Sequence, residues 1–320
     1  MASPARGWHG CVMTDTVTLT SNQLTARISP HGARLETLCF EGGPSLVLHT
    51  DPDTHPDWRS FYPGAIVGPV ANRVKGGRFT LNGTTCQMPC NENGIAALHS
   101  GPDGLDQRVW TITDQSASDL HLHITLPDGD GGLPGTREIE AHYAVRDATL
   151  TLTITARTDA PTPINIAHHP YWRLGDAAAH LLQVAAPHYL PVDARNIPTG
   201  EIAPVTGTAF DHSAPRPLDP QVDHNLCCAT ARRDRPTHLA TLTGTNGLQL
   251  DVDSTEPGLQ VYAGAHLPTL PGTDIAPFAG IALEPQGWPD AVNQPHFPSV
   301  LCAPDQPYRQ ITRYRITRAT

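Results

Sequence analysis

Strict alternation of apolar and polar residues is the feature that most constrains the fold of this chain. Leu120, Leu122, Ile124 and Leu126 alternate with His121, His123 and Thr125, and Leu150, Leu152 and Ile154 alternate with threonines at positions 149 to 155. A period of two places alternate side chains on opposite faces of a strand. We therefore predict half-buried strands here and in further runs of the same kind: Val17–Thr20, Ala141–Val145, Leu248–Val252, Leu259–Ala263 and Arg309–Arg315.

Turn signals separate these runs. Asn82-Gly83 follows Arg78–Leu81 and indicates a hairpin, and residues 127–135 form a long turn rich in glycine. The 32 prolines and 27 glycines oppose long helices, and the apolar spacing typical of a helix is not sustained anywhere. We predict an all-β fold, either a sandwich or a closed antiparallel sheet. No break in composition suggests a linker, so residues 1–320 are predicted to form one domain.

Composition excludes several classes of partner and location. The net charge is −10 and no basic stripe exists, so neither a nucleic acid nor a polyphosphate is an expected partner. No run of about 18 apolar residues predicts a membrane span, and residues 1–10 lack the apolar core of a signal peptide. The seven cysteines show neither a disulfide framework nor a zinc spacing. We expect a cytoplasmic protein, monomeric or homodimeric.

The motifs of common enzyme classes are absent from the sequence. It contains no Walker A loop, no GxGxxG after a strand, no HExxH and no GxSxG. Dense polar segments stand instead among plain strands, and they supply His, Glu, Asp, Asn, Arg, Tyr and Trp. Such side chains can bond the hydroxyls of a neutral sugar. The segments are Gly68–Phe79, Leu98–Gly101, Ala167–Leu174, Val222–Asn225, Thr255–Tyr262 and Ala282–Asn293.

These segments, in this order, resemble the aldose 1-epimerase (galactose mutarotase) family. The resemblance runs from about Gly64 to Arg315 and includes the spacer Gly131–Gly135 and the ending Asn293–Pro298. It implies a large antiparallel β-sandwich, the supersandwich of galactose mutarotase, with a sugar cleft across one sheet. It also implies an isomerase that interconverts the α and β anomers of free aldoses such as glucose or galactose, without a metal or an organic cofactor.

The resemblance assigns roles position by position. His169 matches the family's general acid and Glu284 its general base. The substrate-binding positions that it implies are Asn72, Arg73, His99, Asp223 and Glu256.

The proposed acid, His169, must carry a proton at the pH at which the enzyme works. An ordinary histidine titrates near 6.5, so His169 needs help to carry a proton at neutral pH. We expect a nearby carboxylate, Asp223 or Glu256, to raise its pKa. Among the tryptophans, Trp288 is the favoured platform for a sugar ring.

Departures from the family pattern leave the preferred sugar open. Pro69, His168, Ser100, Arg173 and Glu256 replace the usual residues beside the cleft.

Three alternatives stay open. The chain can be a non-catalytic sugar-binding or regulatory module on the same scaffold, since fold does not decide function. It can also be a hexose-phosphate epimerase, with Arg73 and Arg173 holding the phosphate. The adjacent His168 and His169 can form a metal pair, although neighbouring residues of a strand point to opposite faces.

Overall fold

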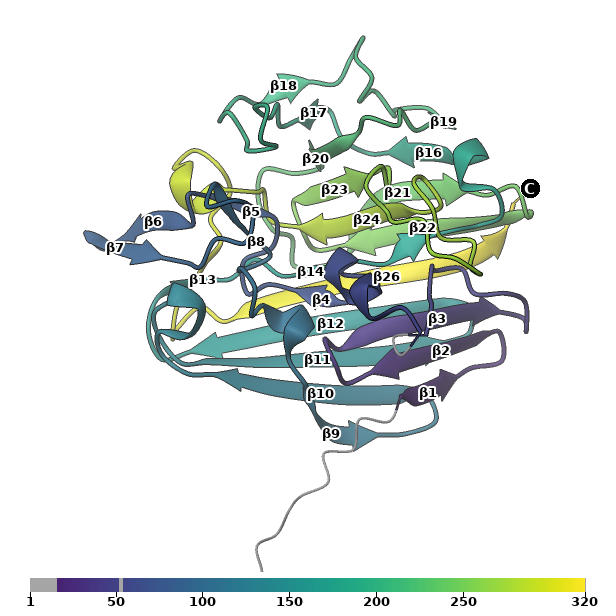
Figure 1. Cartoon of the computed structure of the whole chain (residues 1–320), viewed down its shortest axis with the longest axis horizontal. Coiled ribbons are helices and arrows are strands. Elements are labelled where there is room, and N and C mark those ends of the chain that lie inside the picture. Colours follow the sequence, from purple (N-terminus) through teal and green to yellow (C-terminus); the bar gives the residue numbers. More distant parts are fainter. Residues whose placement is uncertain (1–15, 52–53, 320) are drawn as a thin grey trace, which may run out of the picture.

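Antiparallel strands make up nearly all regular structure in the computed structural model, which describes residues 16–51 and 54–319 (Figure 1). Within these ranges the largest sheet has nine strands, all paired antiparallel. Their order is β19 (Arg216–Pro217), β16 (Leu181–Val184), β21 (Thr237–Thr243), β22 (Leu248–Ser254), β26 (Tyr308–Arg318), β12 (Thr149–Thr158), β11 (Arg137–Arg146), β10 (Asp119–Leu126) and β9 (Thr111–Gln115).

A second sheet carries the residues of interest. In the described chain it has six strands in the order β15 (Tyr171–Trp172), β24 (Ile281–Gln286), β23 (Gly258–Tyr262), β20 (Asp223–Cys227), β17 (His188–Tyr189) and β18 (Ala203–Pro204). A third sheet contains β1 (Val17–Thr20), β2 (Leu24–Ser29) and β3 (Arg34–Phe40).

Short ladders complete the described fold. They pair β4 (Ile66–Val67) with β14 (Ala167–His168), β5 (Arg73–Lys75) with β8 (Ala96–Leu98), β6 (Arg78–Leu81) with β7 (Thr84–Gln87), and β13 (Thr162–Pro163) with β25 (Leu301–Cys302). The helices of the described residues are short 3-10 turns: η1 (Pro56–Phe61), η2 (Leu105–Gln107), η3 (Asp130–Gly132), η4 (Ala177–Ala179) and η5 (Ala291–Asn293).

The structure confirms the predicted antiparallel β-sandwich. Each alternating run named above lies in a strand except for Ala263, which follows the end of β23, and Asn82-Gly83 joins β6 to β7 with both residues at positive φ. No helix of the described residues is long and apolar enough to cross a membrane. The expectation about a signal peptide concerns residues 1–10, which lie outside the described residues.

One apolar core lies between the two large sheets. It takes Leu122 and Leu152 from the nine-stranded sheet and Leu259 and Leu283 from the six-stranded sheet, all fully buried. Because side chains alternate along a strand, burying Leu259 and Leu283 turns Gln260 and Glu284 to the other face. The core thus presents a polar face of the six-stranded sheet to the loops that cover it.

The β4–β14 ladder brings a second chain segment to that face. Its backbone contacts include Gly64, whose N–H donates to the carbonyl of His169 at 2.8 Å. Gly64 has φ of +66°, and a Cβ there would run into the carbonyl oxygen of Leu35. Only glycine fits this turn without strain, because L side chains avoid positive φ and the adjacent backbone leaves no room.

Gly64→Ala therefore should destabilise the protein by about 2 kcal/mol or more, from backbone strain plus the clash with Leu35. Gly83→Ala is the matched control, since Gly83 also has positive φ (+80°) but nothing lies within 4 Å of the added carbon. We expect the control to lose only about 1 kcal/mol. Urea unfolding measures both, and equal losses would show that the Leu35 contact is unimportant.

Candidate active site

A pocket lies on the polar face of the six-stranded sheet. Glu284 in β24 stands directly opposite Gln260 in β23, and Tyr262 stands opposite Asp223 in β20. Together with loop residues these side chains line a pocket of about 580 Å³, including its open mouth.

A second groove has the same volume but different chemistry. It is lined by Phe79, Leu81, Val292, Phe297 and Leu301 among others, and none of its lining residues is titratable. The pocket above the six-stranded sheet brings together histidines, carboxylates and an arginine. The pocket above the six-stranded sheet is therefore the candidate site for acid–base chemistry.

His169 enters the pocket from the end of β14. Its backbone N–H donates to the carbonyl of Ala65 at 2.9 Å, and its own carbonyl accepts from Gly64 at 2.8 Å. His168, one residue earlier, points into the core, where its ring nitrogens lie 3.1 Å from Tyr314 Oη and from the Gly64 carbonyl oxygen. The two adjacent histidines thus face different ways, which leaves no common metal position for them.

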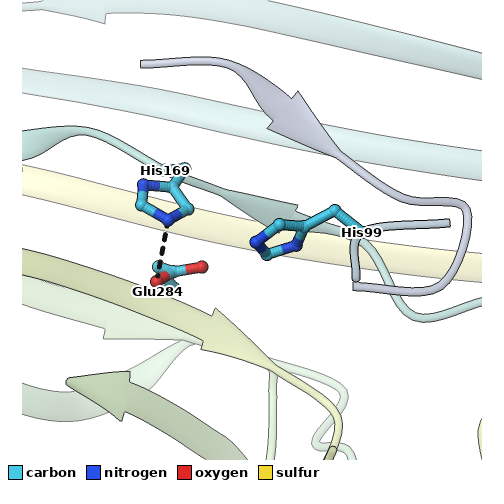
Figure 2. A group of neighbouring side chains, drawn as sticks. All are labelled: His99, His169 and Glu284. Carbon is cyan, nitrogen blue, oxygen red and sulfur yellow. Dashed lines mark ion pairs between the residues drawn. The ribbon is translucent and has the colours of Figure 1, made fainter. Parts of the chain in front are cut away.

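His169 and Glu284 both line the pocket, and Figure 2 shows their side chains pointing toward each other. His169 Nε2 lies 3.4 Å from Glu284 Oε1, and the two side chains are 6% and 2% exposed. Among the described residues, His169 Nδ1 and Glu284 Oε2 have no hydrogen-bond partner. Unpartnered buried polar atoms cost free energy, so such a pair at a pocket wall is typical of a functional site.

Burial favours the uncharged form of both His169 and Glu284. Removal from water lowers the pKa of His169 to about 4 and raises that of Glu284 well above its ordinary value. The expectation that Asp223 or Glu256 raises the pKa of His169 is wrong, because desolvation dominates and neither carboxylate is among its causes. The net charge buried at this pair is smallest when His169 and Glu284 together hold one exchangeable proton.

His99 and Asn72 flank the short β5–β8 ladder and are joined by two hydrogen bonds. Asn72 accepts through its carbonyl from the His99 backbone N–H at 3.0 Å, and its own backbone N–H donates to His99 Nδ1 at 3.1 Å. A ring nitrogen that accepts cannot carry the proton, so neutral His99 holds its proton on Nε2. Burial lowers the pKa of His99 well below its ordinary value, so this tautomer is a fixed hydrogen-bond donor.

Arg73 and Asp223 form the charged side of the pocket. Arg73 makes a bidentate pair with Glu92 at 2.7 and 2.9 Å, and its Nη1 lies 3.8 Å from Asp223 Oδ2. Gln260 Nε2 donates to Asp223 Oδ1 at 2.6 Å. The guanidinium therefore already has two carboxylate partners, and the Asp223 carboxylate is held in one orientation.

Aromatic rings close the pocket at its other sides. Tyr62 packs edge-on against His99 with ring centroids 4.6 Å apart, and Tyr171 packs against His169 at 5.0 Å. Tyr262 and His266 also line the pocket. Trp288 does not: it is 2% exposed and packs against Phe297 away from the pocket lining. The prediction of Trp288 as a sugar platform is wrong because that ring fills a separate apolar cluster.

Glu256, predicted as a substrate-binding residue, also lies outside the pocket. Its carboxylate pairs with Arg232, with Arg232 Nε 2.7 Å from Glu256 Oε1, and is completely buried. It does not line the pocket, whereas Asn72, Arg73, His99, His169, Asp223 and Glu284 all do. The error has a simple cause: Glu256 lies before β23 begins, and the pocket face of that strand starts with Gln260.

Sequence analysis missed the contributions of Gln260 and the tyrosines. Gln260 and Tyr262 alternate with Leu259 and Val261 in a run predicted as a strand. This alternation puts Gln260 and Tyr262 on the face opposite Leu259, so it is the sequence pattern from which both could have been predicted as site residues. No comparable signal existed for Tyr62, which follows the 3-10 turn η1.

A metal ion fits the centre of the pocket poorly. Among the described residues that line the pocket, the ligand atoms of His99, His169 and Glu284 lie within 4.8 Å of one another and are the ones that could hold an ion. A metal-binding histidine uses an unprotonated nitrogen toward the ion and donates from the other. His99 has the reverse arrangement, since Asn72 donates to its Nδ1. Two ligands remain, fewer than a stable zinc site uses.

Comparison with known families and proteins agrees with this geometry. The model of the family described as Aldose 1-epimerase matches residues 15–315. The chain is 37% identical over 275 residues to galactose mutarotase of Bos taurus, covering 81% of this chain and 80% of that protein. It is 31% identical over 293 residues to aldose 1-epimerase of Escherichia coli K12, covering 85% and 84%.

Solved structures show the same architecture. The aldose epimerase homologue from C. elegans superposes with a TM-score of 0.87 at 28% identity, covering 96% of this chain and 99% of that one. Galactose 1-epimerase from Lactobacillus acidophilus superposes with a TM-score of 0.83 at 26% identity, covering 95% of both chains.

The fixed tautomer of His99 can be tested directly. We expect the folded protein at pH 6 to show His99 neutral, with its proton on Nε2, because burial and the Asn72 N–H both oppose protonation at Nδ1. Long-range ¹H–¹⁵N correlation spectra distinguish the tautomers, with the His99→Gln protein identifying the signal. A proton on Nδ1 at this pH, in either charge state, would contradict the assignment.

Proposed function

The chain belongs to the aldose 1-epimerase family, and we propose that its His169–Glu284 pair carries out the interconversion of α and β anomers. The protein is an isomerase of free aldoses. One observation carries the assignment of the pair: an imidazole and a carboxylate, 3.4 Å apart and almost completely buried, line a pocket that is rich in polar side chains.

The reaction requires two proton movements at one end of the sugar ring. Opening of the pyranose removes a proton from the C1 hydroxyl and gives a proton to the ring oxygen, which leaves an aldehyde at C1. Rotation about C1–C2 and closure in reverse give the other anomer, so no atom or electron is lost or gained. A pair that holds one proton can accept at one member while it donates from the other.

The pair performs this exchange without changing its total charge. In the reacting form the shared proton lies on His169, so the Glu284 carboxylate takes the C1 proton while His169 gives its proton to the ring oxygen. Opening leaves Glu284 protonated and His169 neutral. The pair holds one exchangeable proton before and after opening, so its net charge stays at zero, although burial makes the charged reacting form the minor one. His99, as a fixed Nε2–H donor, is suited to bond a sugar oxygen but not to remove a proton.

The remaining polar residues suit a neutral sugar. We assign hydroxyl binding to Asn72, Arg73, His99 and Asp223, which line the pocket beside the pair. Gln260 joins them and orients Asp223. Glucose and galactose are the proposed substrates, and several relatives carry the name galactose mutarotase.

The alternatives receive less support. A hexose phosphate needs a free arginine, but Arg73 is paired with Glu92, and Arg173 lies outside the pocket lining with its Nη1 3.2 Å from Asp274. A non-catalytic module does not need a buried, unpartnered acid–base pair. We also propose a cytoplasmic location, with which the unpaired state of the six described cysteines agrees.

Glu284→Gln should lower kcat/KM for freshly dissolved α-D-galactose or α-D-glucose by about 10²- to 10⁴-fold, because an amide cannot accept the proton. Polarimetry measures the rate. Glu256→Gln is the matched control, an equally buried carboxylate outside the pocket. It should leave kcat/KM unchanged at temperatures where circular dichroism shows both variants folded. A Glu284→Gln protein with wild-type activity would remove this residue as the base.

The pH dependence follows from the directions of the two pKa values. A second proton binds the pair only as pH falls through the lowered pKa of His169, about 4, and the shared proton leaves only above the raised pKa of Glu284. We therefore expect kcat/KM to be flat from about one pH unit above the lowered pKa of His169 up to the raised pKa of Glu284. A decline centred near 6.5, the ordinary histidine value, would show instead that an imidazolium of unperturbed pKa is the acid.

A further inference from the structure

Three histidines share one patch on the outer face of the nine-stranded sheet, remote in sequence from every pocket segment. His121 and His123 lie on β10, and because Leu120 and Leu122 point into the core, both histidines point outward. On β11, His142 stands directly opposite His121, and Glu140 stands directly opposite His123. The four side chains occupy the corners of a rectangle on two adjacent strands, which Figure 1 shows side by side.

The rings of this patch are close and lightly held. The imidazoles of His121 and His142 stack with centroids 4.0 Å apart and planes within 9°. His142 Nε2 lies 3.1 Å from Asp119 Oδ1, but Asp119 also pairs with Arg146 through both oxygens at 2.8 Å. Moving His142 would therefore leave the Asp119 carboxylate paired.

The other two histidines are freer still. In the described chain, the ring nitrogens of His121 and His123 have no hydrogen-bond partner. Either nitrogen of each ring can therefore carry the proton, and either can bind a ligand. This is the reverse of His99 in the pocket, whose tautomer is held by the backbone.

We propose that His121, His123, His142 and Glu140 bind a divalent transition-metal ion of the zinc type. Two histidines at positions i and i+2 of a strand plus one from the neighbouring strand give three imidazole nitrogens, a donor set that suits zinc, nickel and copper. Directly opposite side chains begin only about 5 Å apart, within reach of zinc–nitrogen bonds of about 2.0–2.1 Å.

Binding requires rotation of the side chains but not of the backbone. The nitrogen lone pairs of stacked rings lie in nearly parallel planes, so His121 and His142 must tilt toward a common point above the sheet. Glu140, exposed and bonded only by Thr155 Oγ1 at 3.3 Å, completes the tetrahedron or gives way to water. The ion would join β10 to β11 beside the edge strand β9 and, by binding only the folded chain, stabilise it.

Zinc titration of the full chain by isothermal calorimetry tests the proposal, with wild type compared with H121Q/H142Q and with H123Q. We expect one zinc per chain in wild type and at least a tenfold loss of affinity in each variant. His238→Gln is the matched control: an exposed histidine of β21 in the same sheet, beside Asp253, that should leave the affinity unchanged. Zinc should also raise the Tm of wild type and of the control, but not of H121Q/H142Q.

The activity assay separates this patch from the pocket. Ion binding at the patch should leave the polarimetric rate unchanged at the zinc concentration that saturates the calorimetric signal. Wild-type affinity in H121Q/H142Q, or wild-type affinity in H123Q, overturns the proposal. Inhibition that tracks the binding curve overturns it too, since the zinc then lies at His169 and Glu284.

Discussion

His169 and Glu284 are two ionisable groups in contact in the protein interior, and their positions depend on the whole fold. Glu284 lies on β24, the second strand from one edge of the six-stranded sheet, while His169 is fixed to Gly64 and Ala65 through its backbone. Charging either buried group alone would be costly. A single shared proton avoids that cost, and it is also what a reaction that removes one proton and supplies another requires.

The charged groups of the pocket are arranged around this neutral centre rather than within it. Arg73, Glu92 and Asp223 compensate one another, and Gln260 holds the Asp223 carboxylate. Groups with partners already in place lose little freedom when a ligand arrives, which is the physical advantage of a preorganised site. A neutral sugar exchanges hydroxyl bonds with such a network without adding charge.

Histidine serves several purposes in this chain, and surroundings separate them. His168 is a core residue with both ring nitrogens bonded, His99 is locked as a donor by a backbone N–H, and His169 shares a proton with a carboxylate. His121 and His123 are restrained by no hydrogen bond in the described structure. The residue type alone says little, because burial and the partner of each nitrogen determine the protonation state.

The sequence by itself determined the strands, the turn at Asn82-Gly83 and the family, because alternation, turn chemistry and motif order are local properties of the chain. It also placed His169, Glu284, Asn72, Arg73, His99 and Asp223 in the candidate site through a family resemblance. Only the tertiary structure decided that Glu256 pairs with Arg232 and that Trp288 packs in its own cluster. The tertiary structure also decided that burial lowers the pKa of His169 and favours its neutral form. Pairing across strands and loss of water arise from residues far apart in the chain, and no local pattern contains them.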